Sequence, residues 1–311
     1  MEETLTKRKV SITLEKRDTN NNIEYTATYE NGLDVKFSYT RFLGNGMFGR
    51  GRVSICGLSM DTIAMFTSFW SEDTELAKKK TVKVSAGYEA NGYEEAKMGT
   101  IIEGSIVSAI PTMPPDIWLN CEVVNSYETK FQTFSFSMKG KYTLEKTVEN
   151  IAQFLKLEPE IRLDKTDTNY RNRELKNISF IGDKFALVNK IEEMFTIKKD
   201  DKNGGIIAYI EDNKLVIDYS NLELNQYNRD GTPTLIDKAH GMVGVPEPMW
   251  AGQAVKITTL LNPAIKTGDV IQLKSDLIPS LNGYYYVFTI SYEGQFRGTN
   301  WYSSFVCKRL R

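Results

Sequence analysis

Three glycines, Gly44, Gly46 and Gly49, form the spacing G-x-G-x-x-G, which is the pattern of a loop that binds a dinucleotide. That chemistry requires a helix directly after the glycines, because the helix N-terminus receives the pyrophosphate. Here the residues that follow, from Gly51 to Cys56, read as a strand instead. The sequence therefore predicts a loop between two strands and no nucleotide site.

His240 is the only histidine in the chain, so a catalytic triad or a multi-histidine metal site would depend on it alone. It lies in a turn-rich segment, where we expect a loop residue rather than a catalyst. Ser59 follows Gly57 and Leu58 as in a nucleophile elbow, but the closing glycine is absent at Asp61. Ser59 is better explained as the N-cap of a short helix.

Adjacent carboxylates occur at Glu94-Glu95 and at Glu192-Glu193. Neighbouring positions on a helix do not face a common point, so we expect both pairs on the solvated surface. The sequence thus predicts a non-enzymatic protein with no catalytic, cofactor-binding or metal-binding residues. An enzyme built from two carboxylates on separate strands stays open as an alternative, because one sequence does not show which residues converge.

The cysteines, Cys56, Cys121 and Cys307, are widely spaced and each lies in a strand-like apolar pattern. Their odd number and the lack of a C-x-x-C spacing argue against a disulfide framework and against a zinc site. Free cysteine behaves as a small hydrophobic residue in protein interiors. We therefore expect buried, reduced thiols.

The charge of the chain is nearly balanced, with a formal net charge of −1 at pH 7. This balance gives no overall field that would hold duplex DNA or an anionic membrane. Local basic clusters at Lys78–Lys80 and Lys308–Arg311 lack interleaved aromatic residues and are expected at solvated edges. No apolar run is long enough to span a membrane, and residues 1–9 lack the apolar core of a secretory signal. We expect no membrane insertion and a chain that is made and kept in a cytoplasm until it is assembled.

Residues 9–140 are predicted to be mainly β. The strongest local signal is a hairpin, in which residues 25–29 and 33–39 alternate on either side of Asn31-Gly32. One short helix is expected from Ser59 to Trp70, with Ile63, Phe66 and Trp70 on one side. The other predicted strands lie at 10–14, 82–88, 100–110, 117–123 and 134–138.

The pattern changes to helices and short strands over residues 141–225. One helix is expected behind Thr143, with Leu144, Val148, Ile151, Ala152 and Leu155 at helical spacing. A second helix follows Gly182-Asp183. Short strands are predicted at 177–180, 206–210 and 215–217, the last two joined by a turn at Asp212-Asn213. Such alternation indicates a compact α+β domain.

Residues 226–311 begin with a turn-rich linker and return to sheet. Tyr284, Tyr286, Phe288, Ile290 and Tyr292 are predicted to share one face of a long strand, which we expect to be core and subunit interface. A further strand places Trp301, Ser303, Phe305 and Cys307 on one face. The predicted fold is thus mainly β with an α+β insert: residues 1–140 read as a small barrel or sandwich, 141–225 as the compact α+β domain, and 226–311 as a linker and a second β region.

The order of several short motifs resembles the central hub protein of phage baseplates, which is related to the trimeric base of type VI secretion spikes. The likeness covers almost the whole chain, and its force lies in the number and order of the motifs. They are Arg52–Leu58, Val84–Tyr88, Gly104–Val107, Pro114–Leu119, Ile151–Leu155, Phe180–Gly182, Gly241–Pro246, Leu260–Pro263 and Gly298–Tyr302.

The resemblance implies a structural role in the virion. Two barrel-like domains of each chain would form a pseudo-sixfold ring in a homotrimer, which connects the tail tube to the central spike and lets DNA pass. The implied partners are the spike, a tail tube or distal tail protein, baseplate wedge proteins and the tape-measure protein. A receptor- or carbohydrate-binding tail protein is the alternative, and it would expose aromatic rings in a groove.

Overall fold

The computed structural model of the protein describes residues 7–18, 20, 22–43, 49–68, 80–89, 97–125, 133–165, 168–195, 205–211, 214–219, 233–249 and 254–310. The chain forms two compact units. The first unit holds Met1–Phe42, Phe48–Glu128 and Pro233–Arg309, and the second holds Leu43–Met47, Thr129–Thr232 and Leu310–Arg311. The first unit is therefore assembled from both ends of the chain, whereas the second comes almost entirely from its middle.

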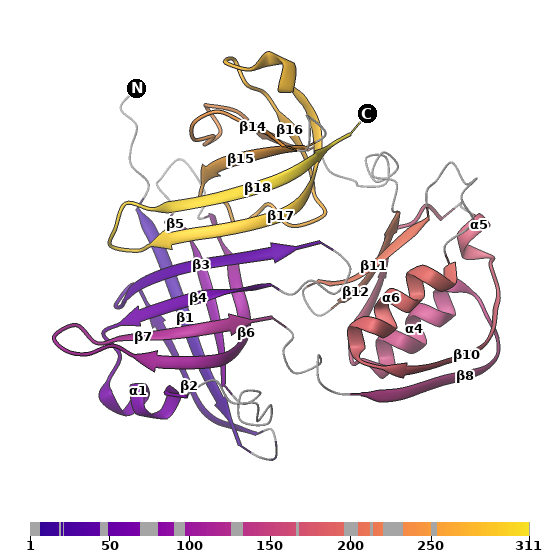
Figure 1. Ribbon diagram of the computed structural model, residues 1–311, viewed down its shortest axis with the longest axis horizontal. Helices are drawn as coiled ribbons and strands as arrows, with labels where there is room; N and C mark the ends of the chain where they lie inside the picture. Colours follow the sequence, from indigo (N-terminus) through magenta and orange to yellow (C-terminus); the bar gives the residue numbers. More distant parts are fainter. Residues whose placement is uncertain are drawn as a thin grey trace. The chain divides into compact units, whose positions relative to one another are not determined.

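The first unit is built on a 13-stranded sheet (Figure 1). Its N-terminal elements are β1 (Arg8–Arg17), β2 (Ile23–Glu30), β3 (Asp34–Phe42), β4 (Arg50–Cys56), α1 (Met60–Phe66), β5 (Lys80–Tyr88), β6 (Lys97–Pro111) and β7 (Trp118–Val124). Its C-terminal elements are β13 (Thr234–Ile236), β14 (Glu247–Met249), β15 (Ala254–Leu260), β16 (Val270–Leu273), the 3₁₀ helix η2 (Pro279–Leu281), β17 (Gly283–Gln295) and β18 (Trp301–Arg309).

The strands follow one hydrogen-bonded path in the order β14-β15-β18-β17-β3-β4-β7-β6-β5-β1-β2, and β16 joins β13 to β17. The two ends of the chain meet where β3 pairs antiparallel with β17, from Phe42 opposite Thr289 to Lys36 opposite Gln295. The predicted mainly β fold with a few helices is confirmed. The described strands do not close into separate barrels, because β17 occupies the edge of β3 that would have closed an N-terminal one.

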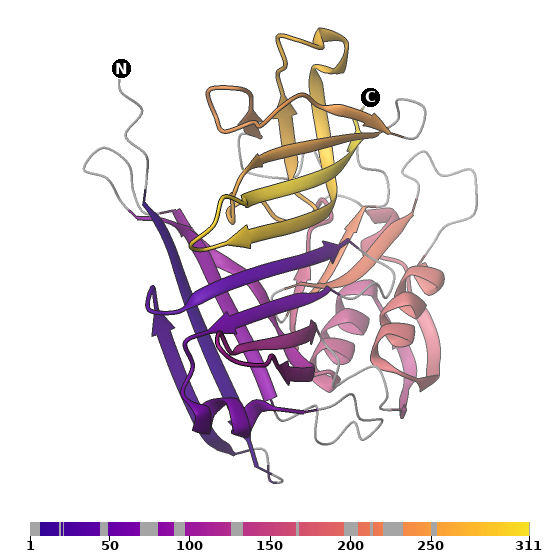
Figure 2. The ribbon, with the colours of Figure 1, turned by 60° about the vertical axis from the view of Figure 1, so that its left-hand side comes forward.

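The large hydrophobic core of the first unit draws on both ends of the chain. Ile12 of β1, Val84 of β5 and Val53 of β4 are fully buried in the same cluster as Ile290 and Phe305. Figures 1 and 2 show β1 and β2 running steeply across β3, β4 and β7, so the sheet folds over and encloses this cluster. Burying such a side chain contributes about 1.5–3 kcal/mol, which ties the two ends of the chain together.

The short helix α1 covers part of this core. The hydroxyl of Ser59 accepts a hydrogen bond from the backbone N–H of Thr62 at 3.2 Å, which confirms the predicted N-cap. Ile63 and Phe66 are buried as expected, while Trp70 lies outside the described residues. At the C-terminal end, Lys80 Nζ donates to the carbonyl oxygens of Phe66 and Thr67 at 3.2 and 3.1 Å, and burial lowers the pKa of this amine.

The predicted hairpin at Asn31-Gly32 is wrong. Strands β2 and β3 both exist, but β2 pairs with β1, and β3 pairs with β4 and β17. Asn31 has the expected positive φ of 54°, yet it bonds to β1: its N–H donates to the Val10 carbonyl, and its Oδ1 accepts from the Val10 N–H, both at 3.0 Å. The turn therefore connects β2, at one end of the sheet, to β3, which lies between β4 and β17.

The aromatic strand β17 does not keep one face throughout. Its pairing with β18 shifts register between Val287 and Thr289. As a result Tyr285 and Val287 reach the core before the shift, and Ile290 and Tyr292 reach it after. Of the face predicted to be core and subunit interface, Tyr284 is 40% exposed, whereas Tyr286 is fully buried. The predicted face of β18 is confirmed, since Trp301, Ser303, Phe305 and Cys307 are all buried.

The second unit packs two helices against two small sheets. Its elements are β8 (Phe134–Tyr142), α4 (Leu144–Phe154), β9 (Glu158–Ile161), α5 (Thr168–Arg171), β10 (Leu175–Gly182), α6 (Lys184–Phe195), β11 (Ile206–Glu211) and β12 (Lys214–Tyr219). Strand β8 pairs with β10, and β12 pairs with β11 and β9. The sequence grouped Phe136 and Met138 with the first β region, but both belong to the core of this unit.

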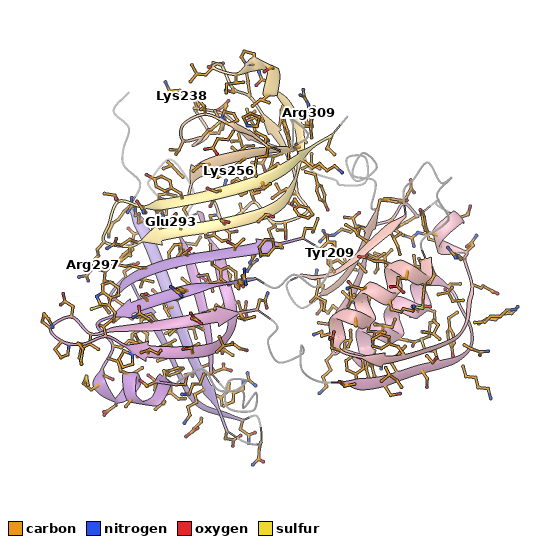
Figure 3. All side chains as sticks on the ribbon, in the orientation of Figure 1. Tyr209, Lys238, Lys256, Glu293, Arg297 and Arg309 are labelled. Atoms are coloured by element: carbon orange, nitrogen blue, oxygen red, sulfur yellow. The ribbon has the colours of Figure 1, made fainter. Side chains whose placement is uncertain are left out.

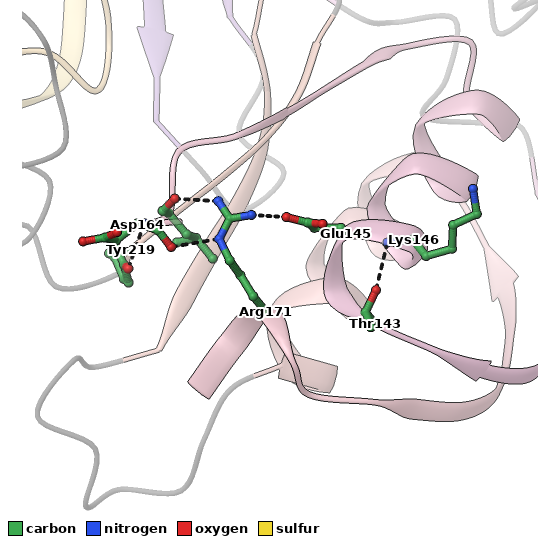
Figure 4. Close-up of polar contacts among 7 residues, drawn as sticks. Thr143, Glu145, Lys146, Asp164, Arg171 and Tyr219 are labelled. Atoms are coloured by element: carbon green, nitrogen blue, oxygen red, sulfur yellow. Dashed lines mark hydrogen bonds and ion pairs between the residues drawn. The ribbon is translucent and has the colours of Figure 1, made fainter. Parts of the chain in front are cut away.

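Both predicted helices of this unit are confirmed. Thr143 caps α4 by accepting a hydrogen bond from the Lys146 N–H at 3.4 Å (Figure 4). The core of the unit contains Leu144, Val148, Ile151 and Ala152 of α4, as predicted, and the predicted Leu155 packs against it partly buried. The helix α6 adds Leu187, Val188, Ile191 and Phe195 to the same core. The predicted turn at Asp212-Asn213 lies outside the described residues.

Arg171 fastens the connection between β9 and α5 to α4. Its Nε and one terminal nitrogen donate to the carbonyl oxygens of Asp164 and Leu163 at 2.8 and 2.7 Å, and the other terminal nitrogen donates to the carboxylate of Glu145 (Figure 4). The backbone N–H of Asp164 in turn donates to the hydroxyl of Tyr219 at 3.1 Å. This polar network holds an irregular segment in place through the rigid fork of one guanidinium.

Candidate functional site: the polar face of the large sheet

The residues that the sequence singled out do not converge. In the part of the chain that the structure describes, no group of three or more His, Cys, Asp and Glu residues could hold a metal ion. Gly49 precedes strand β4 rather than a helix, as predicted, while Gly44 and Gly46 lie outside the described residues. Glu94-Glu95 and Lys78-Lys79 also lie outside them.

His240 is an exposed loop residue, as predicted. Its Nδ1 lies 2.7 Å from Oδ1 of Asp237, and its backbone N–H donates to the same oxygen at 2.8 Å. The side-chain hydrogen bond from His240 is the main reason why the pKa of Asp237 is below its ordinary value. This arrangement closes a turn and brings no nucleophile to the imidazole.

The expectation for the cysteines holds for two of the three. Cys121 and Cys307 are fully buried, and burial raises the pKa of the Cys121 thiol to about 12. The pKa of Cys307 is raised for the same reason. Cys56 is only half-buried, and all three thiols are free. Buried thiols with raised pKa values are poor nucleophiles.

Glu192 was expected on the solvated surface with Glu193, and that prediction is wrong. Its carboxylate accepts a hydrogen bond from the Ala208 N–H at 2.8 Å, and burial raises its pKa. The carboxylate joins α6 to β11, which is a structural role. Glu193 is exposed and pairs with Lys190 at 2.6 Å. Sequence alone could not separate the two, because the difference depends on which strand packs beside α6.

A polar surface that the sequence did not predict lies on the large sheet. We call it the polar face, and it is the side of the large sheet that points away from the core, from β15 to β7. Its members are Lys256 and Thr258 of β15, Tyr302, Ser304 and Val306 of β18, Ser291 and Glu293 of β17, Lys36, Ser38 and Thr40 of β3, Arg50, Arg52 and Ser54 of β4, and Asn120, Glu122 and Val124 of β7. Figure 3 labels Lys256 and Glu293 on this surface.

Cross-strand pairs of hydroxyls and amides join neighbouring strands on the polar face. Thr258 and Ser304 approach to 3.1 Å, Thr40 and Ser291 to 3.0 Å, and the Ser54 hydroxyl donates to Asn120 Oδ1 at 2.6 Å. The Thr40–Ser291 pair bridges the two ends of the chain. Such pairs set the register of a sheet and leave its outer surface hydrophilic.

Several charges on the polar face have partners within the face or beside it. Arg52 donates to Glu122 at 3.1 Å, and Glu293 accepts from Asn300 at 3.1 Å. The ammonium of Lys36 lies 4.1 Å from the ring centre of Trp118 at the end of β7. The surface therefore carries both signs of charge and many neutral hydroxyls, without a continuous basic stripe.

A surface hollow of about 230 Å³ lies on the polar face and is lined by Lys36, Phe37, Ser38, Arg52, Ser54, Glu293, Gly294, Gln295 and Asn300. Pockets for small ligands usually measure about 300–1,000 Å³ and are mostly apolar. The hollow is smaller, and most of the residues that line it have polar or charged side chains, so it does not resemble a cofactor or substrate site. None of the helices in the described residues is long and apolar enough to cross a membrane.

Solved structures with the same fold are phage tail and type VI secretion proteins. The chain superimposes on a 43 kDa tail protein of prophage MuSo2 from Shewanella oneidensis with a TM-score of 0.55 at 11% identity, covering 96% of each chain. It also matches a Francisella PdpA-VgrG complex, with a TM-score of 0.58 and 8% identity over 98% of this chain and 58% of the other.

A third match is an E. coli component of the type VI secretion system that is described as structurally similar to T4 bacteriophage tail proteins gp27 and gp5. Its TM-score is 0.54 at 9% identity, over 90% of this chain and 74% of that one. At such low identities these likenesses define the class of fold. Comparison by sequence with curated proteins gave no significant match.

The family model for the baseplate hub protein gp41 matches residues 9–307. The chain belongs to this baseplate hub family, as the motifs in its sequence indicated. It is a structural component of a phage baseplate, and membership of a structural family implies a non-enzymatic protein of the virion.

Proposed function

We propose that the chain is the central hub of the baseplate: a homotrimer whose pseudo-sixfold ring connects the tail tube to the central spike and lets DNA pass. The observation that carries this proposal is the continuous polar face, to which both ends of the chain contribute strands. A large exposed sheet face suits the wall of a channel, because one side packs on the core and the other meets water.

The chemistry of the polar face suits a wall that DNA slides past. Proteins hold the phosphate backbone of DNA through lysine and arginine side chains that displace counterions. On the polar face Arg52 is paired with Glu122, and short hydroxyls such as Ser38, Thr40 and Ser304 lie between the charged residues. DNA would therefore be a passing cargo and not a ligand.

In this proposal the regions 1–140 and 226–311 supply the two tube-forming parts of each chain. The region 141–225 meets neighbouring proteins of the baseplate. The partners are the central spike, the tail tube or distal tail protein, baseplate wedge proteins and the tape-measure protein, and assembly takes place in the host cytoplasm. No cofactor, metal or catalytic residue takes part in this role.

The test is the mass of the purified chain in solution, followed by electron-microscope images of the particle. We expect a trimer whose averaged images show a ring of about six lobes around a central channel. A chain that stays monomeric at every concentration and binds glycans or host receptors would contradict the proposal and support the alternative of a receptor-binding tail protein. A closed ring with an even number of copies would also contradict it.

A further inference from the structure

We infer that neighbouring copies in the proposed ring meet head to tail through two apolar flanks at opposite ends of the polar face. We call them the β15 flank, formed by Val243, Val245 and Leu260, and the β6 flank, formed by Ile110 and Met113. The inference rests on the proposed ring and names the surfaces that would close it. Each copy would present one flank to the copy ahead and the other to the copy behind.

Both flanks expose large apolar side chains that nothing in the described residues covers. Leu260 is 48% exposed, Ile110 is 46% exposed and Met113 is 86% exposed. Between them lies the hydrophilic polar face. Single exposed apolar residues are ordinary, but two groups at the ends of a polar surface suggest contacts with another protein.

Strand register places the two flanks at the same level along the strands. Leu260 lies opposite Tyr302, and the row continues through Glu293, Ser38, Arg52 and Glu122. Glu122 pairs with Ser108, two residues before Ile110 on β6. Because the flanks lie nearly level, a rotation without a large shift along the strands brings one onto the other. Such an operation gives a closed ring, whereas a shift would give a filament.

The backbone at both flanks is already occupied, so side chains must make the contact. On the β15 side, Val243 N–H donates to the Thr258 carbonyl at 2.8 Å, and Pro248 in the edge strand β14 has no N–H to offer. On the β6 side, Ala109 exchanges backbone hydrogen bonds with Ser68 at 2.8 and 2.9 Å. Proline and short pairings of this kind protect sheet edges against strand addition. We therefore expect apolar packing between copies and not one continuous intermolecular sheet.

A second copy of this chain is the occupant that fits these observations. An isologous dimer would require each flank to face itself, which would leave the other flank exposed. A head-to-tail contact covers both flanks in every copy at once. The head-to-tail contact would also place the polar faces of successive copies side by side around the ring.

The experiment uses the full chain with Cys56→Ser, since Cys121 and Cys307 are buried and have raised pKa values. Ile110→Cys and Leu260→Cys are introduced together, and a short bismaleimide is added. We expect covalent dimers and trimers and no larger species. Each single variant should give no linked product, and so should Ile110→Cys combined with Leu277→Cys, which replaces a leucine that is even more exposed than Leu260.

The outcomes separate the inference from the proposed function. A trimer by mass that the cysteine pair does not link would overturn the inference alone. Cross-linked product from either single-cysteine variant would indicate an isologous contact and would overturn the inference as well. Cross-linked species larger than a trimer would also overturn it. A chain that is neither trimeric nor linked contradicts the ring itself. As a second readout, Leu260→Asp should raise the dissociation constant of the trimer about tenfold or more, and Leu277→Asp should leave it unchanged.

Discussion

The two units of the chain differ in how far apart in the sequence their partners lie. In the first unit β3 pairs with β17, so that Lys36 lies opposite Gln295. In the second unit all strand pairs join residues between 134 and 219. Contacts between distant residues require a long loop to close before they contribute any stability. The comparison teaches that the first unit depends on the end of the chain, whereas the second can form from a local segment.

The largest expected effect comes from ending the chain at residue 232. Loss of the segment that holds strands β13 to β18 removes 15 of the 37 buried residues of the core that contains Ile290 and Phe305, so the N-terminal strands should not fold. The second unit should keep its helices. Hydrogen exchange measured by mass spectrometry should find protection only between residues 133 and 219. Native-like protection in β3 and β4 of the shortened chain would show that the N-terminal region folds alone.

A large but smaller effect is expected for Phe305→Ala. The ring is fully buried, so its removal should cost about 3–5 kcal/mol. Because one core serves both ends of the chain, exchange should accelerate in β1, β4 and β18 together. The matched variant is Leu187→Ala in the core of the second unit, which should accelerate exchange in α4 and α6 only. If Phe305→Ala affected β18 and left β1 protected, the shared core would be disproved.

Arg8→Ala tests a polar connection between the two ends of the first unit. The Arg8 guanidinium donates to the carbonyl oxygens of Gly298 and Thr299 at 2.5 and 3.0 Å and lies 5.3 Å from the Trp301 ring centre. Hydrogen bonds to a charged donor are worth about 1.5–3 kcal/mol when partly buried, and exposure reduces this. We expect a loss of about 1–2 kcal/mol by chemical denaturation. Arg8→Lys keeps the positive charge but lacks the branched guanidinium group, so it should recover less than half of the lost stability.

The smallest effect is expected for Glu160→Gln in the second unit. Partial burial raises the pKa of Glu160, but Arg162 at 2.7 Å and Lys214 at 3.1 Å outweigh it and hold the pKa below its ordinary value of 4.5. A lowered pKa contributes stability above pH 4.5, and that contribution is lost as the pH falls through the folded value. The variant should therefore melt slightly lower than wild type at pH 7, and the difference should be smaller at pH 3. An equal difference at both pH values would rule out this origin.

Much of the local structure could be predicted from the sequence because it depends on neighbouring residues. The caps at Ser59 and Thr143 and the buried face of β18 follow from side-chain chemistry and periodicity. The strand that follows Gly49, in place of a helix, was predicted in the same way. The family also followed from short motifs in a fixed order, and the match to the hub family confirms it.

Three predictions failed where a distant partner decided the outcome. Asn31 makes its turn, but bonds to Val10 of β1 redirect the chain. The register shift after Val287 depends on pairing with β18, so alternation within β17 could not reveal it. Glu192 is partly buried because its carboxylate accepts a hydrogen bond from the Ala208 N–H. In each case the structure agrees with the local propensity of the residues, but several arrangements would have agreed with it. Hydrogen bonds to distant residues determined which arrangement formed.

The sequence by itself determined many of the strands, the helices α1, α4 and α6, the caps of α1 and α4, and the order of the family motifs, because these follow from side chains a few residues apart. Only the tertiary structure decided that β3 joins β17 and that the sheet runs on without closing into separate barrels. The polar face likewise arises only there, since its residues come from strands that are more than 250 positions apart in the chain. Pairing of strands is set by hydrogen bonds and core packing between remote segments, and alternation within one strand does not encode its neighbour.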